Sequence, residues 1–142
     1  MKRQGALLIF VAIMALAVSS CASGAHWGIS SPAVARVEVT EFTNYIDIGA
    51  DAPIDISVTN LTDQELKGLT LSVAADAGDE VKLPSALITI DRIAPNGVWT
   101  PTEPFMVQGL YSGEASVFFT LKQDGKFLST DYTIMEINPV RR

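Results

Sequence analysis

The side chains that could carry out catalysis are few in this sequence of 142 residues, which has one histidine, His26, and one cysteine, Cys21. Nucleophilic catalysis needs a nucleophile and a base that a rigid scaffold holds together. His26 lies in a segment of small residues that no expected strand positions, so a Ser-His-Asp or Cys-His site is not expected. The same count excludes zinc sites built from Cys and His, and no phosphate-binding glycine loop occurs. We therefore expect no enzyme activity and no cofactor.

Carboxylates are the remaining candidates for chemistry. Asp76, Asp79 and Glu80 cluster in the stretch DAGDE, and three aspartates recur every four residues between Asp47 and Asp55. Calcium needs roughly six to eight oxygen ligands, and neither stretch matches the twelve-residue calcium loop. We keep Asp76, Asp79 and Glu80 as weak calcium candidates beside the simpler interpretation, solvated loop charge, and expect no other metal site.

The single cysteine stands where an apolar run near the N-terminus gives way to small polar residues. Lys2 and Arg3 form a cationic start, and Gly5–Val18 is uncharged and nearly all aliphatic. This order of features is typical of a secretory signal peptide. The run has fourteen residues, whereas a transmembrane helix needs roughly 17 to 25. The sequence therefore predicts a signal peptide over residues 1–20 that is removed.

The residues Val18-Ser19-Ser20-Cys21 resemble the lipobox of bacterial lipoproteins. In that family a diacylglyceryl group is attached to the cysteine sulfur, and the chain is cleaved before the cysteine, here between Ser20 and Cys21. The new amino terminus is commonly acylated too, for example with palmitate, and two or more acyl chains hold a protein stably on a membrane. The resemblance implies a lipid anchor in a bacterial cell envelope. Where two membranes exist, a residue other than aspartate after the cysteine implies the outer membrane, and here that residue is Ala22. The alternative is a buried or chance cysteine.

The net charge of the chain and the segment after Cys21 limit which partners are expected. Loss of Lys2 and Arg3 changes the net charge from −6 to −8, and an acidic chain is repelled by phosphate backbones, so nucleic acid is not expected. Residues 21–32 are mostly small and end in proline, which predicts a flexible tether. The tether reaches at most roughly 36 to 40 Å, so the domain is expected near its membrane. Trp27 has two open interpretations, contact with the membrane interface and contact with the domain.

From Val34 onward, apolar and polar residues alternate with the period of half-buried strands, and turn signals separate the runs. This pattern predicts one domain of strands over residues 33–138, followed by a short tail over 139–142, and therefore an all-β fold. About seven short strands of this kind favour a single antiparallel β-sandwich of immunoglobulin-like type. The strands are expected near 34–42, 53–59, 68–75, 86–93, 103–108, 114–122 and 126–137, with a short one near 45–48 or 80–83.

The last hairpin gives the sharpest local prediction. Asp124-Gly125 indicates a two-residue type I′ turn, and on the polar face we expect Phe118 and Phe127 to be diagonal neighbours that form an interaction patch. A loop or the amino-terminal segment over this face is the alternative. On the buried face the expected pairs are Leu121–Leu128, Phe119–Thr130, Val117–Tyr132 and Ala115–Ile134, after Gln123–Lys126 at the turn.

Residues 50–137 also resemble the immunoglobulin-like modules of bacterial envelope proteins, including the CARDB-type (cell-adhesion-related) domains. The likeness lies in the strand end Val58-Thr59-Asn60, in the turn Ile93-Ala94-Pro95-Asn96-Gly97 and in the closing hairpin. A cysteine pair is absent and Trp99 follows a turn, which differs from immunoglobulin domains proper. The resemblance implies the sandwich fold.

These features favour a membrane-anchored lipoprotein whose sandwich is a non-enzymatic interaction or assembly module, with another envelope protein as its partner. The alternative function is a ligand-binding module, for carbohydrate or calcium, that uses loops at one end of the sandwich.

Overall fold

The computed structural model describes residues 32–76 and 79–139, and in these residues it contains ten strands and no helix. All seven expected strands are present. Both places considered for a short strand form one, and a further short strand, β7, was not expected. The strands are β1 (Ala35–Phe42), β2 (Tyr45–Asp47), β3 (Asp51–Asn60), β4 (Leu66–Ala75), β5 (Val81–Lys82), β6 (Leu87–Ile93), β7 (Val98–Trp99), β8 (Phe105–Gly109), β9 (Gly113–Gln123) and β10 (Lys126–Asn138).

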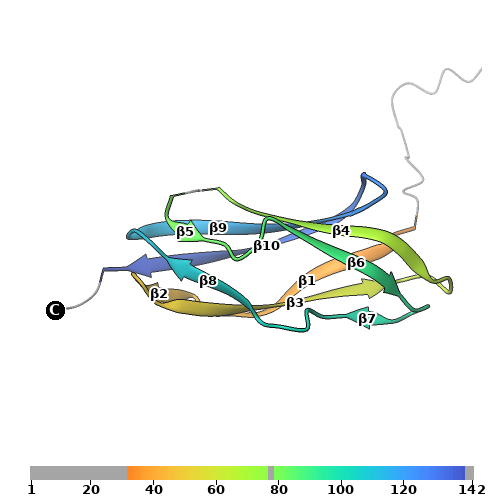
Figure 1. The fold of residues 1–142 in the computed structure, drawn as a ribbon, viewed down its shortest axis with the longest axis horizontal. Helices are drawn as coiled ribbons and strands as arrows, with labels where there is room; N and C mark the ends of the chain where they lie inside the picture. The colour runs from red at the N-terminus through yellow and green to blue at the C-terminus, as the bar shows by residue number, and fades with distance from the viewer. Residues whose placement is uncertain (1–31, 77–78, 140–142) are drawn as a thin grey trace, which may run out of the picture. The chain divides into compact units, whose positions relative to one another are not determined.

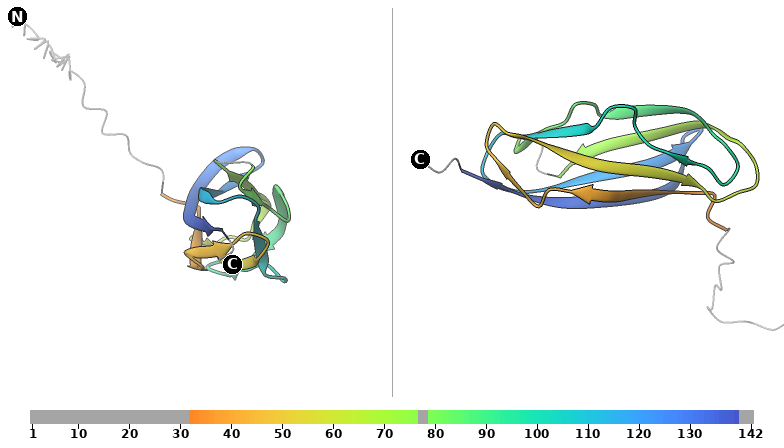
Figure 2. Two further views of the ribbon diagram at one scale, coloured as in Figure 1. Left: turned by 90° about the vertical axis from the view of Figure 1, so that its left-hand side faces the viewer. Right: turned by 90° about the horizontal axis from the view of Figure 1, so that it is seen from below.

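The strands form the two layers of a β-sandwich (Figures 1 and 2). The first sheet has the order β1-β3-β8-β5, and β7 also pairs with β3. The second sheet has the order β2-β10-β9-β4-β6. Neighbouring strands are antiparallel in both sheets except for β2, which runs parallel to β10. The all-β sandwich expected from the alternating pattern is therefore confirmed.

The core lies between the sheets and consists of the apolar side chains at every second position of the long strands. On β9, Ala115, Val117, Phe119 and Leu121 are fully buried. The Phe119 ring packs edge-on against Phe105 of the first sheet, with ring centroids 5.5 Å apart and an interplanar angle of 76°. This edge-to-face arrangement is favourable for aromatic pairs and ties the two layers together.

Asn60, at the end of β3, is a buried polar residue that holds two loops. Its Nδ2 group donates to the backbone oxygens of Gln64 and Ala94, at 2.7 and 3.0 Å, and reaches that of Ile93 at 3.3 Å. Its Oδ1 accepts from the backbone N–H and the hydroxyl of Thr62, at 2.9 and 2.8 Å. Because only 1% of Asn60 is exposed, these bonds satisfy groups that would otherwise be buried without partners.

The β9–β10 hairpin confirms the predicted turn and corrects the predicted register. Asp124 and Gly125 have φ angles of 48° and 80°, as a type I′ turn requires. The pair Gln123–Lys126 forms as expected, and Lys122 pairs with Phe127. A β-bulge between Phe127 and Ser129 then shifts the ladder by one residue. Its extra residue moves every later side chain of β10 to the other face. The pairs that form are Leu121–Ser129, Phe119–Asp131, Val117–Thr133 and Ala115–Met135.

The shift decides which residues of β10 enter the core. Thr133, Met135 and Ile137 are buried, whereas Tyr132 and Ile134 are exposed. The prediction that Tyr132 and Ile134 lie on the buried face was therefore wrong. Apolar residues recur at every second position on both faces of this strand, so alternation alone did not identify the inner face.

The edges of β1 and β10 lie beside each other, and side chains of β10 cap the backbone of β1. The Val37 N–H donates to Ser129 Oγ at 3.3 Å, and the Val39 N–H donates to Asp131 Oδ2 at 2.7 Å. An exposed strand edge is a template for unwanted pairing, and these two bonds occupy part of that edge.

Candidate binding surfaces

An aromatic pair lies on the outer face of the second sheet. Phe118 and Tyr132 are directly opposite each other on β9 and β10, and their rings stack with centroids 5.6 Å apart at 29°. Their exposed fractions are 38% and 54%. Phe127 pairs with Lys122 instead, four residues and therefore roughly 14 Å from Phe118 along β9. Phe118 is therefore exposed on this face, but the expected neighbour was wrong, because Tyr132 and not Phe127 lies beside it.

Two more exposed apolar side chains extend this pair toward β2. Ile134 follows Tyr132 on the same face of β10 and is 44% exposed. Tyr45 of β2 is 62% exposed and lies opposite Glu136, diagonally from Ile134. We call Tyr45, Phe118, Tyr132 and Ile134 the outer patch. Sequence reasoning missed Tyr45, Tyr132 and Ile134 because the bulge and the parallel pairing of β2 decide which way they point.

Apart from Phe127, which lies opposite Lys122 and is 57% exposed, the remaining outer positions of β9 and β10 are polar. Thr120 and Thr130 lie opposite each other next to the aromatic pair, with hydroxyl oxygens 3.3 Å apart. Farther along β9, Glu114 lies at one end of the face and Lys122 at the other. The outer patch therefore lies between an acidic end and a basic residue.

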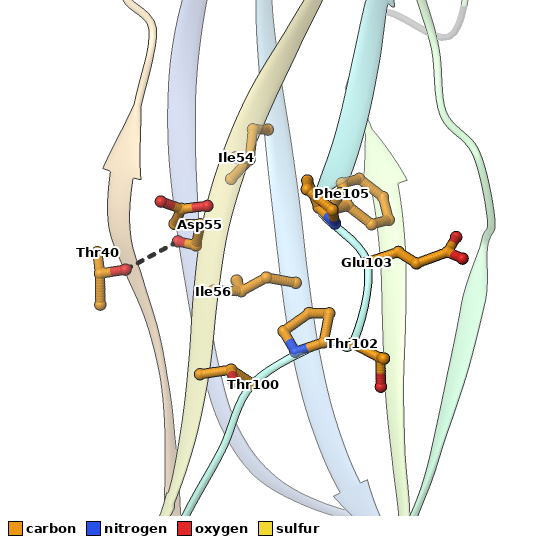
Figure 3. A pocket seen from close by; sticks show the side chains of 10 residues that line it. Thr40, Ile54, Asp55, Ile56, Thr100, Thr102, Glu103 and Phe105 are labelled. Atoms are coloured by element: carbon orange, nitrogen blue, oxygen red, sulfur yellow. Dashed lines mark hydrogen bonds between the residues drawn. The ribbon is translucent and has the colours of Figure 1, made fainter.

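A second feature is a gap in the first sheet, between β3 and the connection over residues 100–104 (Figure 3). Pro101 and Pro104 lie in this connection, and proline cannot donate to a strand ladder, so β7 and β8 pair with β3 only at either side of it. At the gap lies an open hollow of about 370 Å³ whose lining includes Ile54, Ile56 and Phe105.

The backbone of Ile56 faces this gap. Val39, which lies opposite Ile56, points its N–H toward Asp131 and away from β3, so the two residues form a non-hydrogen-bonded pair. The N–H and C=O of Ile56 consequently point to the other side of β3. Thr40 Oγ1 donates to the Asp55 carbonyl at 3.2 Å, and the side chains of Asp55 and Glu103 are exposed at the rim.

The structure does not bring the weak calcium candidates together. Asp76 Oδ1 accepts the Ser116 N–H at 2.7 Å, whereas the Glu80 carboxylate lies against Gly113 and its Oε2 is buried without a hydrogen-bond partner among the described residues. Asp79 is in the adjoining turn. Within residues 32–76 and 79–139, no group of three or more His, Cys, Asp or Glu side chains is placed to hold a metal ion.

The predicted lipidation and cleavage sites, Ser20 and Cys21, lie outside the described residues, as do His26 and Trp27. In the part of the chain that the structure describes, no helix has the length and apolar character to cross a membrane.

No family model matches the chain, and no curated protein matches its sequence. Two structures of the CARDB domain of a Pyrococcus furiosus protein are similar, with TM-scores of 0.56 and 0.58 at 9% identity. They cover 73% and 74% of this chain and 92% and 86% of theirs, and one of them holds the domain in complex with di-metal ions.

Larger proteins contain similar domains. α2-Macroglobulin from Escherichia coli gives a TM-score of 0.55 at 20% identity over 75% of this chain, and red sea bream transglutaminase gives 0.57 at 16% over 72%. The chain spans only 17% of the E. coli chain, which runs from domain MG7 to the C-terminus, and 15% of the transglutaminase chain. At such identities the likeness shows the fold alone: the described residues form an immunoglobulin-like β-sandwich, and CARDB domains are among the structures that it resembles.

Proposed function

We propose that this protein is a lipoprotein of a bacterial cell envelope, anchored through Cys21, whose sandwich is a non-enzymatic module that binds another envelope protein. The observation that carries the binding role is the outer patch. It places two exposed aromatic rings on a sheet face where the polar residues Thr120 and Thr130 lie beside them, and aromatic side chains are enriched in protein–protein interfaces. An apolar patch rimmed by polar residues is the usual form of such a contact.

The anchoring role rests on the lipobox-like sequence and on the length of the tether. Cys21 precedes the first described residue, Pro32, by eleven positions. A flexible chain of that length spans about 18 Å on average. The sandwich would be held close to its membrane, where the partner is expected.

Anchoring is tested by fatty-acid labelling in a bacterial host and by fractionation of its membranes. The wild-type chain should carry the label and stay in the membrane fraction after salt and alkali washes. Cys21→Ser should lose both properties, while Ser23→Ala, two residues farther along the tether, should keep them. Equal membrane retention of Cys21→Ser and wild type would show that the anchor is wrongly assigned.

Partner binding is tested on envelopes solubilised in mild detergent and separated on native gels. The wild-type chain should migrate in a species larger than the monomer, and Phe118→Ser should release it. Met106→Ser is the matched control, because Met106 is also 38% exposed but belongs to β8 of the first sheet. A complex that survives Phe118→Ser, or that both variants disrupt equally, would contradict the role of the outer patch.

The gap in the first sheet supports a second candidate function, binding of carbohydrate or calcium. Its volume lies within the range of ligand pockets, about 300 to 1,000 Å³. Hydroxyl groups of Thr40, Thr100 and Thr102 and the carboxylates of Asp55 and Glu103 line it. Calorimetric titration with calcium chloride and with oligosaccharides checks this function. Binding that Asp55→Asn weakens supports it, and the absence of heat with every ligand rejects it.

A further inference from the structure

We propose that the outer face of the second sheet binds the same face of a second copy of this chain. In this dimer a two-fold axis lies between the two faces, perpendicular to the strands, and passes over Phe118 of β9. The β9 strands of the two copies therefore run antiparallel. The proposal rests on the interaction role proposed above and names a second copy of this chain, itself an envelope protein under that proposal, as the partner that covers the outer patch.

The charges on β9 fit this arrangement. Successive outward positions of β9 carry Glu114, Ser116, Phe118, Thr120 and Lys122. Glu114 and Lys122 are each four residues from Phe118, in opposite directions. Rotation about an axis at Phe118 therefore places Glu114 over Lys122 of the second copy, and the symmetry repeats this pair. An axis parallel to the strands would place Glu114 over Glu114, so the charges favour the antiparallel dimer.

A pair of like charges within one copy also favours the antiparallel dimer. Glu114 and Glu136 lie directly opposite each other on β9 and β10, and like charges in opposite positions destabilise a sheet. Within the described residues, neither carboxylate is within ion-pair distance of a basic group, and Lys122 has no acidic partner. Lys122 of the second copy would lie over Glu114, next to Glu136, and reduce the repulsion between the two carboxylates.

The size of the face suits a dimer. With about 3.4 Å per residue along a strand and about 4.8 Å between strands, the second sheet covers roughly 700 Å². A standard interface buries about 800 Å² on each partner. The polar residues beside the aromatic pair, Thr120, Thr130 and Ser72, have small side chains that allow two sheets to approach to the usual spacing of about 10 Å.

Contacts at the axis supply the apolar part of the interface. The aromatic row of Phe118 and Tyr132 meets its own copy, so these two exposed rings become covered at the centre of the interface. A self-complementary surface of this kind closes a two-fold dimer without leaving a free binding face. The acidic and basic residues then lie toward the rim, where they fix the relative orientation of the copies.

The test is a charge reversal on the full chain in non-ionic detergent, with the association constant measured by sedimentation. Glu114→Lys alone and Lys122→Glu alone each bring like charges together twice, and each should weaken association about tenfold or more. The double variant restores opposite charges and should return to within about threefold of wild type. Phe118→Ser should abolish association, and Lys82→Glu, on β5 of the first sheet, should leave it unchanged.

Recovery in the double variant is specific to a contact between two copies. Glu114 and Lys122 of one copy are roughly 27 Å apart along β9, so recovery cannot come from a contact within one chain. Two lipidated chains that share a micelle by chance would not respond to Glu114→Lys. A zero-length carbodiimide cross-link between peptides of isotopically labelled and unlabelled chains, joining Glu114 to Lys122, would confirm the register.

A wild-type chain that stays monomeric at about 100 μM, or single variants that weaken association without recovery in the double variant, would overturn the dimer. If the chain is monomeric while Phe118→Ser still releases a different envelope protein on native gels, the dimer is wrong and the proposed interaction role remains. If Phe118→Ser changes neither association nor the native-gel complex, both proposals are wrong.

Discussion

The outer faces of the two sheets differ in what they present to solvent, although both belong to the same sandwich. On the first sheet, Arg36 and Glu38 of β1 form an exposed ion pair at 3.2 Å, and Asp51 and Asp55 of β3 are exposed. On the second sheet the central outward side chains are Phe118 and Tyr132. Charged positions solvate a sheet face and oppose its association, whereas exposed aromatic positions favour a covered face. The first sheet also exposes Met106 and Val98, but only the second sheet carries a stacked aromatic pair at its centre, and this difference supports the proposed binding role of its outer face.

Neighbouring phenylalanines on β9 give the largest expected contrast. Phe119 is fully buried against Phe105, so Phe119→Ala should lower the free energy of unfolding by about 3 to 5 kcal/mol. Phe118 points outward, and Phe118→Ala should cost about 1 kcal/mol or less. Urea unfolding of the two variants checks this difference. Equal losses of stability would mean that the outer face is as well covered within one chain as the core.

The next effect concerns Asn60, which belongs to neither outer face and joins the loops that follow β3 and β6. Asn60→Ala leaves several buried backbone oxygens without a donor and should lower the unfolding free energy by about 2 to 4 kcal/mol. Gln64→Ala, at an exposed position in the same loop, is the control and should cost less than about 0.5 kcal/mol. A small loss for Asn60→Ala in urea unfolding would show that water replaces its hydrogen bonds.

A smaller effect is expected where the two sheets meet at their edges. Asp131→Ala removes the acceptor of the Val39 N–H and should cost about 1 to 2 kcal/mol, as expected for a hydrogen bond to a charged group. Hydrogen exchange of the Val39 amide should become faster, whereas the Val58 amide inside the first sheet should be unaffected. Asp131→Asn keeps an acceptor and should be intermediate. Unchanged exchange at Val39 would contradict the capping role of Asp131.

The smallest effect is expected on the solvated face. Both partners of the Arg36–Glu38 pair are well exposed, and exposed ion pairs contribute about 1 kcal/mol at most. Arg36→Gln should therefore change the unfolding free energy by less than about 0.5 kcal/mol and should leave self-association unchanged in sedimentation. A large loss in either measurement would mean that the first sheet is also an interface.

Much of the fold could be predicted from the sequence because alternation fixes long strands and Asp124-Gly125 fixes a turn. The register of β10 could not be predicted in the same way. Tyr132 and Ile134 alternate on one side of the strand and Met135 and Ile137 on the other, so both faces looked apolar. Only the bulge after Phe127 decides between them, and it depends on packing against β9 and β1, which local pattern does not contain.

The same reason limits the prediction of the site. Phe118 could be identified because it breaks the polar face of an otherwise clear strand. Tyr45 could not, since β2 has three residues and its place beside β10 comes from a parallel pairing across most of the chain. Pro101 and Pro104 are a sequence signal for the gap in the first sheet. The strand before the gap, β7, could not be predicted, because it has two residues and alternation is not recognisable over so short a stretch.

Hydroxyl-radical footprinting in intact envelope membranes tests most directly whether the outer face of the second sheet is covered in the cell. Tyr132 and Tyr111 are 54% and 63% exposed in the isolated chain, and Tyr111 lies in the β8–β9 connection outside the outer patch, so it serves as an internal control. In membranes, oxidation of Tyr132 should fall several-fold relative to Tyr111, and in the Phe118→Ser chain it should recover. Equal oxidation of Tyr132 and Tyr111 in membranes would contradict a covered face.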